Sequence, residues 1–318
     1  METMNLIETG EAHRKRKSFG AAVECFTQAL EQEPENLLAL RGLADSFRGL
    51  KAFPDCIAIW RRYLDLKPRD VSTIVRLGDA HKKMGNRDEA IRCYSQALEM
   101  NSTNRYALMG LGDLYYREQD LSKALEYWEI LIKLDPTLVN IQTMVGNIHR
   151  KHLRFERARA CFEAALQSAP NNPYAIFGMA DTLRGLGEFE QAAPFWRIML
   201  KMDPDNHQVM TRAGDCFLRL SLFTEAEELF KRALAIRFEK PAGLGLARTY
   251  RQMGAHREAI QCYRDILDRS PDDIRTALQL ADTLAEASGP QAAKDFLVEE
   301  LGKRPSLREL ENALTRLG

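Results

Sequence analysis

Proline residues recur along this chain at a fixed spacing of 34 residues. They stand at Pro34, Pro68, Pro136, Pro170 and Pro204, and Ser102 occupies the one remaining place in the series. A period of this length indicates a tandem array in which each repeat is one supersecondary unit. A chain of 318 residues would otherwise suggest two globular cores, so the period replaces that expectation with a stack of nearest neighbours.

Three positions of the repeat keep their residue type from one end of the array to the other. The spacing places nine repeats, which start at residues 3, 37, 71, 105, 139, 173, 207, 240 and 274. Position 8 is always Gly or Ala, position 20 is Ala or Cys, and position 24 is aromatic until Leu297 in the last repeat. Small residues opposite large rings predict two helices that pack closely.

The apolar residues of each repeat form two stripes with helical spacing. Positions 4, 7, 8 and 11 share one side of a helix, and positions 20, 21, 24, 27 and 28 form a second stripe after a polar turn. Turns contain residues such as Gly85 and Gly187, and the proline at position 32 ends the second helix. Each repeat is therefore predicted to be a helical hairpin.

The repeat at residues 105–138 carries the most complete set of these residues. It holds Leu108, Leu111, Gly112, Tyr115, Ala124, Trp128 and Pro136. This series resembles the tetratricopeptide repeat, and the resemblance covers residues 3–305. It implies an all-α fold, a right-handed superhelical solenoid of nine helix-turn-helix repeats, with a capping helix over residues 306–318. The cap is predicted from Ser306 with Glu309 and from the stripe Leu307, Leu310, Leu314 and Leu317.

Alternate repeats differ in a consistent way, so a second period of 68 residues is present. Even-numbered repeats have Gly at position 6, as in Gly110 and Gly178, and mostly Trp at position 24. Odd-numbered repeats have Phe or Tyr at position 24, and Met144 fills position 6 in the fifth repeat. We infer duplication of a two-repeat block, and we expect Gly110 and Gly178 to leave open clefts for a partner's side chains.

Composition and motifs argue against several functions. Lys plus Arg and Asp plus Glu are 45 each, so no overall field would attract nucleic acid or anionic lipid. Apolar stretches are too short for a signal peptide or membrane span, and the six cysteines form no C-x-x-C pair. We therefore expect a cytoplasmic protein with reduced thiols, without nucleic-acid binding or membrane insertion.

No residues combine into a recognisable catalytic, cofactor or metal motif. His149 and His152 lie three apart but lack a carboxylate within one turn, and Gly243 with Gly245 is only a fragment of a dinucleotide-binding motif. The histidines at position 11 are interpreted as structural, and the three tryptophans, Trp60, Trp128 and Trp196, as core residues. The chain is therefore predicted not to be an enzyme and to need no cofactor or metal.

The candidate binding residues lie on the first helix of each repeat. The resemblance assigns positions 2, 5, 6, 9, 12 and 13 to a concave groove that members of the family use for ligands. In repeats four to six these positions hold six candidate apolar anchors and three candidate hydrogen-bond acceptors: Tyr106, Met109, Tyr116, Met144, Tyr174 and Phe177, with Asp113, Asn147 and Asp181. Acidic acceptors would favour Lys or Arg in the ligand. Two alternatives stay open: the aspartates pair with Lys or Arg three or four residues further on, and the apolar groups form an ordinary exposed surface.

The leading hypothesis is a scaffold or adaptor that binds a peptide or helix of a partner protein in this groove. The alternative is a non-catalytic subunit that recruits substrates to, or regulates, a larger enzyme complex. The co-chaperone subclass is disfavoured, because Asp45 and Gly110 stand where its carboxylate-binding pattern requires Asn and a basic residue. Neither the partner nor the oligomeric state follows from these residues.

Overall fold

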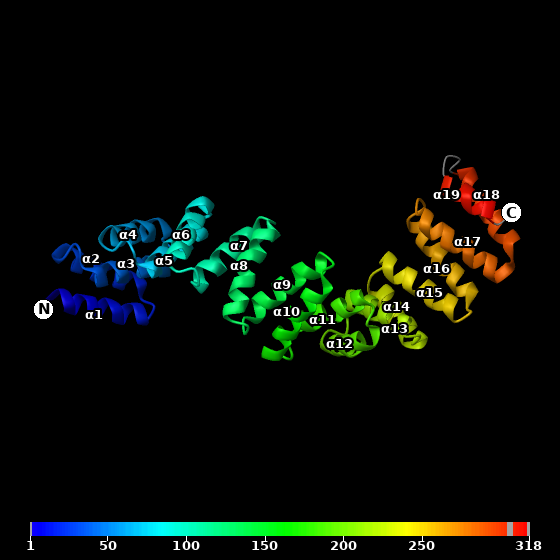
Figure 1. Ribbon diagram of the computed structural model, residues 1–318, viewed down its shortest axis with the longest axis horizontal. Helices are drawn as coiled ribbons and strands as arrows, with labels where there is room; N and C mark the ends of the chain where they lie inside the picture. Colours follow the sequence, from blue (N-terminus) through cyan, green and yellow to red (C-terminus); the bar gives the residue numbers. More distant parts are fainter. Residues whose placement is uncertain (1, 304–307, 317–318) are drawn as a thin grey trace. The chain divides into compact units, whose positions relative to one another are not determined.

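The computed structural model describes residues 2–303 and 308–316, and every regular element in these ranges is an α-helix. Figure 1 shows the helices following one another as antiparallel pairs. The chain divides into two compact parts, Met1–Ile141 (the N-terminal part) and Gln142–Gly318 (the C-terminal part). The predicted all-α solenoid is confirmed.

In each part, a helix contacts its partner within the repeat and the next helix along the chain. The N-terminal part contains α1 (Glu2–Lys15), α2 (Phe19–Gln32), α3 (Leu37–Gly49), α4 (Phe53–Leu66), α5 (Val71–Met84), α6 (Arg87–Met100), α7 (Arg105–Arg117) and α8 (Leu121–Leu134). The division falls inside α9 (Val139–Lys151). The C-terminal part continues with α10 (Phe155–Ser168), α11 (Pro173–Leu186), α12 (Phe189–Met202), α13 (His207–Arg219), α14 (Phe223–Ile236), α15 (Lys240–Gln252), α16 (His256–Arg269), α17 (Ile274–Ser288), α18 (Pro290–Lys303) and α19 (Arg308–Arg316).

Short polar side chains determine where the first helices of most repeats begin. Asn104 accepts a hydrogen bond from the backbone N–H of Ala107, and Asn172 accepts one from that of Ala175. Such an N-cap satisfies a backbone donor that has no partner within the helix. The same arrangement starts α3, α5 and α13, at Asn36, Asp70 and Asn206.

The turn inside each hairpin requires one left-handed residue, where glycine is favoured. Gly85, Gly187 and Gly254 meet this requirement with φ between 74° and 80°. In other repeats a residue with a side chain takes the same conformation, as Leu153 does with φ of 58°. The turn geometry is thus imposed by helix packing even where the residue type does not favour it.

In every repeat before the last, the aromatic ring at position 24 lies in the core. Trp60, Trp128 and Trp196 are all 0% exposed, which confirms their assignment to the core. The small residues at position 20, for example Ala124 and Ala192, are buried as well, and Gly112 at position 8 of the first helix lies directly against the ring of Trp128. Each ring therefore fills the space that small residues leave between two helices.

The glycines at position 6 are also packing positions, and this corrects one expectation. A methyl group at Gly110 would overlap the ring of Tyr94, and one at Gly178 would overlap the ring of Phe162. Both rings belong to the preceding odd repeat and are 0% exposed. The glycines therefore receive a ring from the protein itself and leave no open cleft for a partner, which explains the 68-residue period.

At the C-terminal end, α19 packs against the last hairpin. Leu310 is fully buried with Ala281, Ala293 and Leu297, and Leu314 packs against the same cluster. Ser306, Leu307 and Leu317 of the expected cap lie outside the described residues.

Candidate functional site

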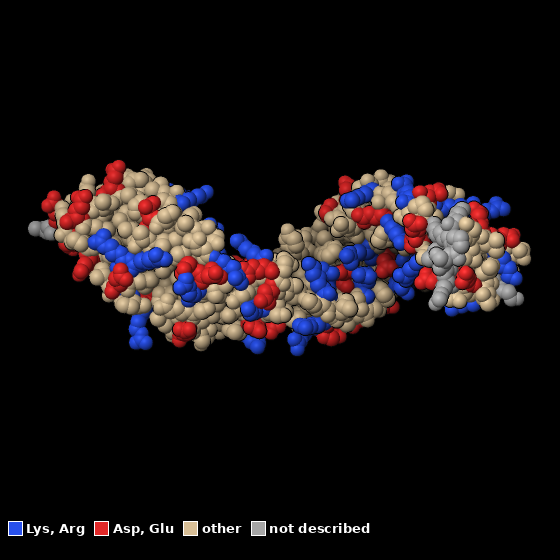
Figure 2. All heavy atoms as spheres, turned by 90° about the horizontal axis from the view of Figure 1, so that it is seen from above, with Lys and Arg blue, Asp and Glu red and all other residues tan. Residues whose placement is uncertain are grey.

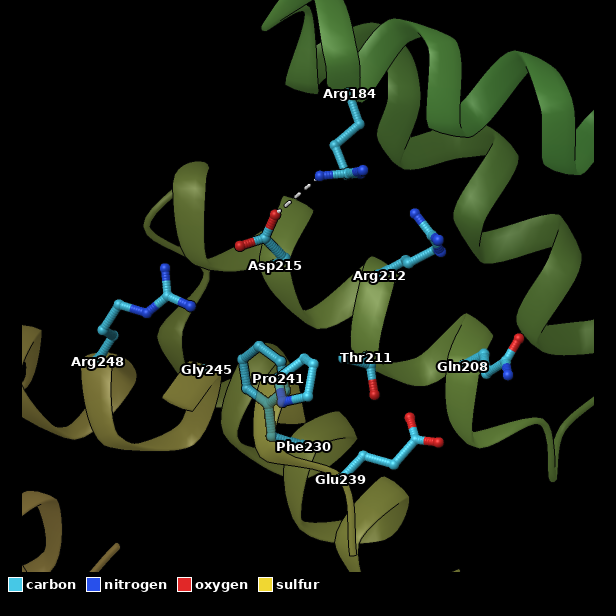
Figure 3. A pocket seen from close by; sticks show the side chains of 10 residues that line it. All are labelled: Arg184, Gln208, Thr211, Arg212, Asp215, Phe230, Glu239, Pro241, Gly245 and Arg248. Atoms are coloured by element: carbon cyan, nitrogen blue, oxygen red, sulfur yellow. Dashed lines mark hydrogen bonds and ion pairs between the residues drawn. The ribbon is translucent and has the colours of Figure 1, made fainter. Parts of the chain in front are cut away.

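A pocket of about 430 Å³ opens on the first helices of the C-terminal part. Its walls come from α11, α13 and α15, and it lies over the buried ring of Phe230. Figure 3 shows its lining residues: Arg184, Gln208, Thr211, Arg212, Asp215, Phe230, Glu239, Pro241, Gly245 and Arg248. The residues that the first helices contribute occupy positions 2, 5, 6, 9 and 12 of their repeats, a surface that we call the first-helix face.

Beside this pocket, one buried aspartate organises three arginines from successive first helices. Asp181 is 3% exposed, and its carboxylate lies 2.9 Å from an Nη atom of Arg184 and 2.6 Å from one of Arg212. It also pairs with Arg150. Burial alone would raise the pKa of Asp181, but the three guanidinium groups outweigh it and hold the pKa below its ordinary value.

The same cluster occurs four repeats earlier, in the N-terminal part. Asp45 is 8% exposed and pairs with Arg76 at 2.6 Å, Arg48 at 3.2 Å and Arg14 at 3.9 Å. Each of these residues precedes its counterpart in the Asp181 cluster by 136 residues, or two 68-residue blocks. Both clusters join three consecutive repeats through one carboxylate.

The arginines therefore occupy the carboxylate of Asp181, one of the predicted acceptors, and that of Asp45 at the same position of its repeat. Asp45 and Asp181 are buried between repeats. Local pairing at three residues occurs for Arg48 and Arg184, but the remaining partners come from neighbouring repeats, 31 residues away in sequence.

The other two predicted acceptors are less buried and also have protein partners. Asp113 has a side chain 34% exposed and lies 3.2 Å from the Nζ atom of Lys82. The side-chain oxygen of Asn147 accepts a hydrogen bond of 3.2 Å from Arg150. Both residues keep part of their surface open to solvent, in contrast to Asp181.

The predicted apolar anchors fall into two groups. Tyr106 and Tyr174 are 74% and 72% exposed, and each sits at position 2 of an even repeat. Met109 in the N-terminal part and Met144 in the C-terminal part are half-buried. In this set the tyrosines at position 2 are the side chains most open to contact.

Tyr116 and Phe177 are held by the core. The Tyr116 ring lies 5.2 Å from that of Trp128, and the Phe177 ring meets Trp196 edge-on at 5.5 Å. Arg150 and Arg212 lie 6.0 and 5.7 Å from the centre of the Phe177 ring. These two rings therefore help to build the face as well as being partly exposed on it.

The arginine clusters were missed at the level of sequence, although a signal for them exists. Arg14, Arg48 and Arg76 repeat as Arg150, Arg184 and Arg212 with Asp45 and Asp181 between them. Spacings of 31 residues between Arg and Asp mark the pairs that cross repeats. Helix-local spacings of three and four residues do not reveal these pairs, because the partners lie in different repeats.

The histidine and cysteine side chains that could act chemically, such as His81, His149 and Cys56, are buried. His81 and His149 are each 3% exposed, and burial lowers the pKa of His81. Burial raises the pKa of the Cys56 thiol to about 11. Across residues 2–303 and 308–316, no group of three His, Cys, Asp or Glu side chains is arranged to hold a metal ion. No helix in those ranges is long and apolar enough to cross a membrane; the cytoplasmic location stays a prediction.

Stacked helical hairpins, whose first helices share one face within each part, define a helical-repeat scaffold. The sequence model of the Tetratricopeptide repeat family matches residues 7–71, 75–138 and 177–241, and a second model of the same description matches residues 244–275. The chain therefore belongs to the tetratricopeptide repeat family. Members of this family are protein-interaction scaffolds that bind protein or peptide partners and are generally non-catalytic.

Individual proteins resemble this chain in fold, although their sequence identity to it is low. The General transcriptional corepressor ssn6 of Schizosaccharomyces pombe is 24% identical over 120 residues, which is 37% of this chain and 11% of that protein. The chain thus matches only about a tenth of that relative. The C-terminal part of a repeat-containing protein from Cytophaga hutchinsonii superimposes with a TM-score of 0.60 at 16% identity, over 76% of this chain and 99% of that one. YrrB, described as a repeat protein with an unusual peptide-binding site, gives 0.53 at 17% identity, over 57% and 94%.

Proposed function

We propose that this protein is a scaffold whose first-helix face binds an extended segment or a helix of a partner protein. The observation that carries the proposal is the pair Tyr106 and Tyr174, whose side chains are about three-quarters exposed. Tyrosine offers a large contact area at little entropic cost, and exposed aromatic residues are enriched at binding sites. Leu38 and Pro241, also at position 2 of even repeats, are exposed too.

Each residue of the face has a defined role in this proposal. Tyr106 and Tyr174 contact the partner directly, with Met109 and Met144 beside them. Tyr116 and Phe177 present a ring edge while packing on the core. Asp113 and Asn147 accept hydrogen bonds from the partner, and Asp181 holds the arginines in place.

Site-specific photo-crosslinking tests this proposal. A photoreactive phenylalanine analogue is placed at residue 106 or residue 174, and a matched control carries it at residue 153. Leu153 is 73% exposed but belongs to the turn between α9 and α10, away from the first-helix face. We expect a discrete crosslinked protein from positions 106 and 174, identified by mass spectrometry, and none from position 153.

The purified partner then permits a quantitative test. Tyr174→Ala is expected to weaken its binding by about 2 kcal/mol, the size typical of a hot-spot residue. Tyr174 is the better choice than Phe177, because Phe177 contacts Trp196 and its loss would also disturb the core. Equal crosslinking at residue 153, or full affinity in a folded Tyr174→Ala variant, would remove the basis of the proposal.

A further inference from the structure

The pocket of the C-terminal part contains an arginine that has no carboxylate partner. Arg248 takes position 9 of its repeat, where six other repeats have Asp. Its Nε atom donates a hydrogen bond of 3.1 Å to the carbonyl oxygen of Leu244. Throughout the described residues, no Asp or Glu oxygen lies within ion-pair distance of this guanidinium group. Arg248 therefore presents unused N–H donors to the pocket.

The other charges of the pocket are already partly matched. Arg184 pairs with Asp181 and, at 3.4 Å, with Asp215, and Arg212 pairs with Asp181. Glu239 lies 3.9 Å from the Nε atom of Arg237 and 3.4 Å from the Nδ1 atom of His207, which carries a charge only when protonated. In Figure 3, Arg248 extends from α15 on one side of the pocket, whereas Arg184 from α11, paired with Asp215, and Arg212 from α13 lie on the other side. Among the described residues, Arg248 is therefore the charged side chain of this pocket without an ion-pair partner.

Further arginines lie on the other side of Arg248, and one of them, Arg251, is paired with Glu286. A second hollow, of about 440 Å³, is lined by Arg219, Arg248 and Arg251. Figure 2 shows Lys and Arg side chains gathered in the hollowed face over the region of α11 to α14. A partner that crosses this face meets guanidinium groups from three successive repeats.

We propose that the pocket binds an Asp or Glu side chain of the partner segment, which pairs with Arg248. This inference rests on the proposed scaffold function and specifies the chemistry of the bound segment. Guanidinium groups bind carboxylates through two parallel hydrogen bonds, and Asp181 fixes Arg212 and Arg184 beforehand. The free donors of Arg248 thus favour an acidic ligand, whereas the sequence had suggested a basic one.

An acidic polypeptide fits this surface better than a nucleic acid. A single carboxylate can approach Arg248 by itself, whereas a nucleic acid would bring several phosphates near Asp215 and Glu239, which also line the pocket. Base stacking requires an open aromatic face, but Phe230 is 1% exposed and Phe177 has arginines near its ring.

A displayed library of random dodecapeptides, selected on the immobilised full chain, tests the inference. We expect the recovered sequences to be enriched in Asp and Glu. A synthetic peptide from the selection should bind Arg248→Asp at least about tenfold more weakly, because the variant places a carboxylate where the partner's carboxylate binds. This substitution supplies the residue that other repeats already hold at position 9, so the fold should tolerate it. The affinity should also fall as salt rises.

Two further variants separate charge at the pocket from charge in general. Arg264→Gln removes an exposed arginine from α16, outside the pocket, and should leave the affinity unchanged. Arg248→Gln removes the charge without adding a negative one and should show an intermediate loss. Circular dichroism of each variant verifies that the helices are intact.

The possible outcomes are distinct. Selected peptides that are apolar or basic but lack acidic residues would overturn this inference and leave the scaffold proposal standing. A library without any enrichment would count against both. Binding of polyuridylate RNA with the same dependence on Arg248 would overturn the inference in favour of a nucleic-acid surface. Equal losses in Arg264→Gln and Arg248→Gln would assign the effect to overall charge and would also overturn it.

Discussion

Repeats four and six carry the same residue types at their key positions, yet their aspartates have different surroundings. Both have Tyr at position 2, Gly at position 6, Asp at position 9 and Trp at position 24. In repeat six, the side chain of Asp181 is 4% exposed and has three arginine partners. In repeat four, Asp113 is 34% exposed and pairs with Lys82.

The difference comes from two positions on the first-helix face, one in the same repeat as the aspartate and one in the following repeat. Arg184 has its counterpart in Tyr116, and Arg212 has its counterpart in Met144. A buried carboxylate is stable when several charged hydrogen bonds replace its hydration, whereas a half-exposed one retains water. The same aspartate is therefore a structural centre in one repeat and an available acceptor in another.

The largest loss of stability is expected on substitution of the tryptophans, which both repeats have at position 24. Trp128→Ala and Trp196→Ala should each reduce the free energy of unfolding by about 3 to 5 kcal/mol, because both rings fill a fully buried space. Loss of hydrogen-exchange protection should concentrate in the mutated repeat and its neighbours. Unchanged stability in either variant would contradict the shared core packing.

Substitution of the two aspartates should reduce the stability of the chain to different extents. Asp181→Asn leaves three guanidinium groups without their shared carboxylate and should cost about 3 kcal/mol of stability. Asp113→Asn removes one partly exposed ion pair and should cost at most about 1 kcal/mol. Urea denaturation of both variants measures the difference, and equal losses would break the comparison.

Low pH should reduce the stability of repeat six, because the carboxylate of Asp181 becomes protonated. The pKa of this carboxyl is lowered in the folded protein, so its contribution is present above the ordinary pKa of 3.8. That contribution is lost as the pH falls from there through the folded value. The stability difference between the natural chain and Asp181→Asn should thus be constant near neutrality and shrink below about pH 4. A difference that stays constant down to pH 2 would contradict the lowered pKa.

The smallest effect is expected at the exposed tyrosines. Tyr106→Ala and Tyr174→Ala should each change the free energy of unfolding by less than about 0.5 kcal/mol, because their side chains contact mostly solvent. Thermal unfolding followed by circular dichroism measures this. A large loss in only one variant would show that the two tyrosines differ in their packing.

Much of the fold could be predicted because stacking neighbours must satisfy the same packing rules in every repeat. The proline spacing predicted the helical hairpins, and the small residues opposite Trp128 and Trp196 identified the core. The exposure of Tyr106 and Tyr174 was also predicted, since position 2 lies on the side of the first helix away from its apolar stripe. These features depend on contacts within one repeat and between identical neighbours.

The chemistry of the first-helix face was decided by tertiary structure. The repeat pattern by itself determined that position 6 of repeat six is a glycine, Gly178, and that an aspartate, Asp181, follows three residues later. Only packing between repeats decided that the Phe162 ring occupies the space beside Gly178 and that Arg150 and Arg212 reach Asp181. The reason is geometric: stacking brings residues 31 positions apart into ion-pair distance, and the charge that remains there depends on the sum of all partners.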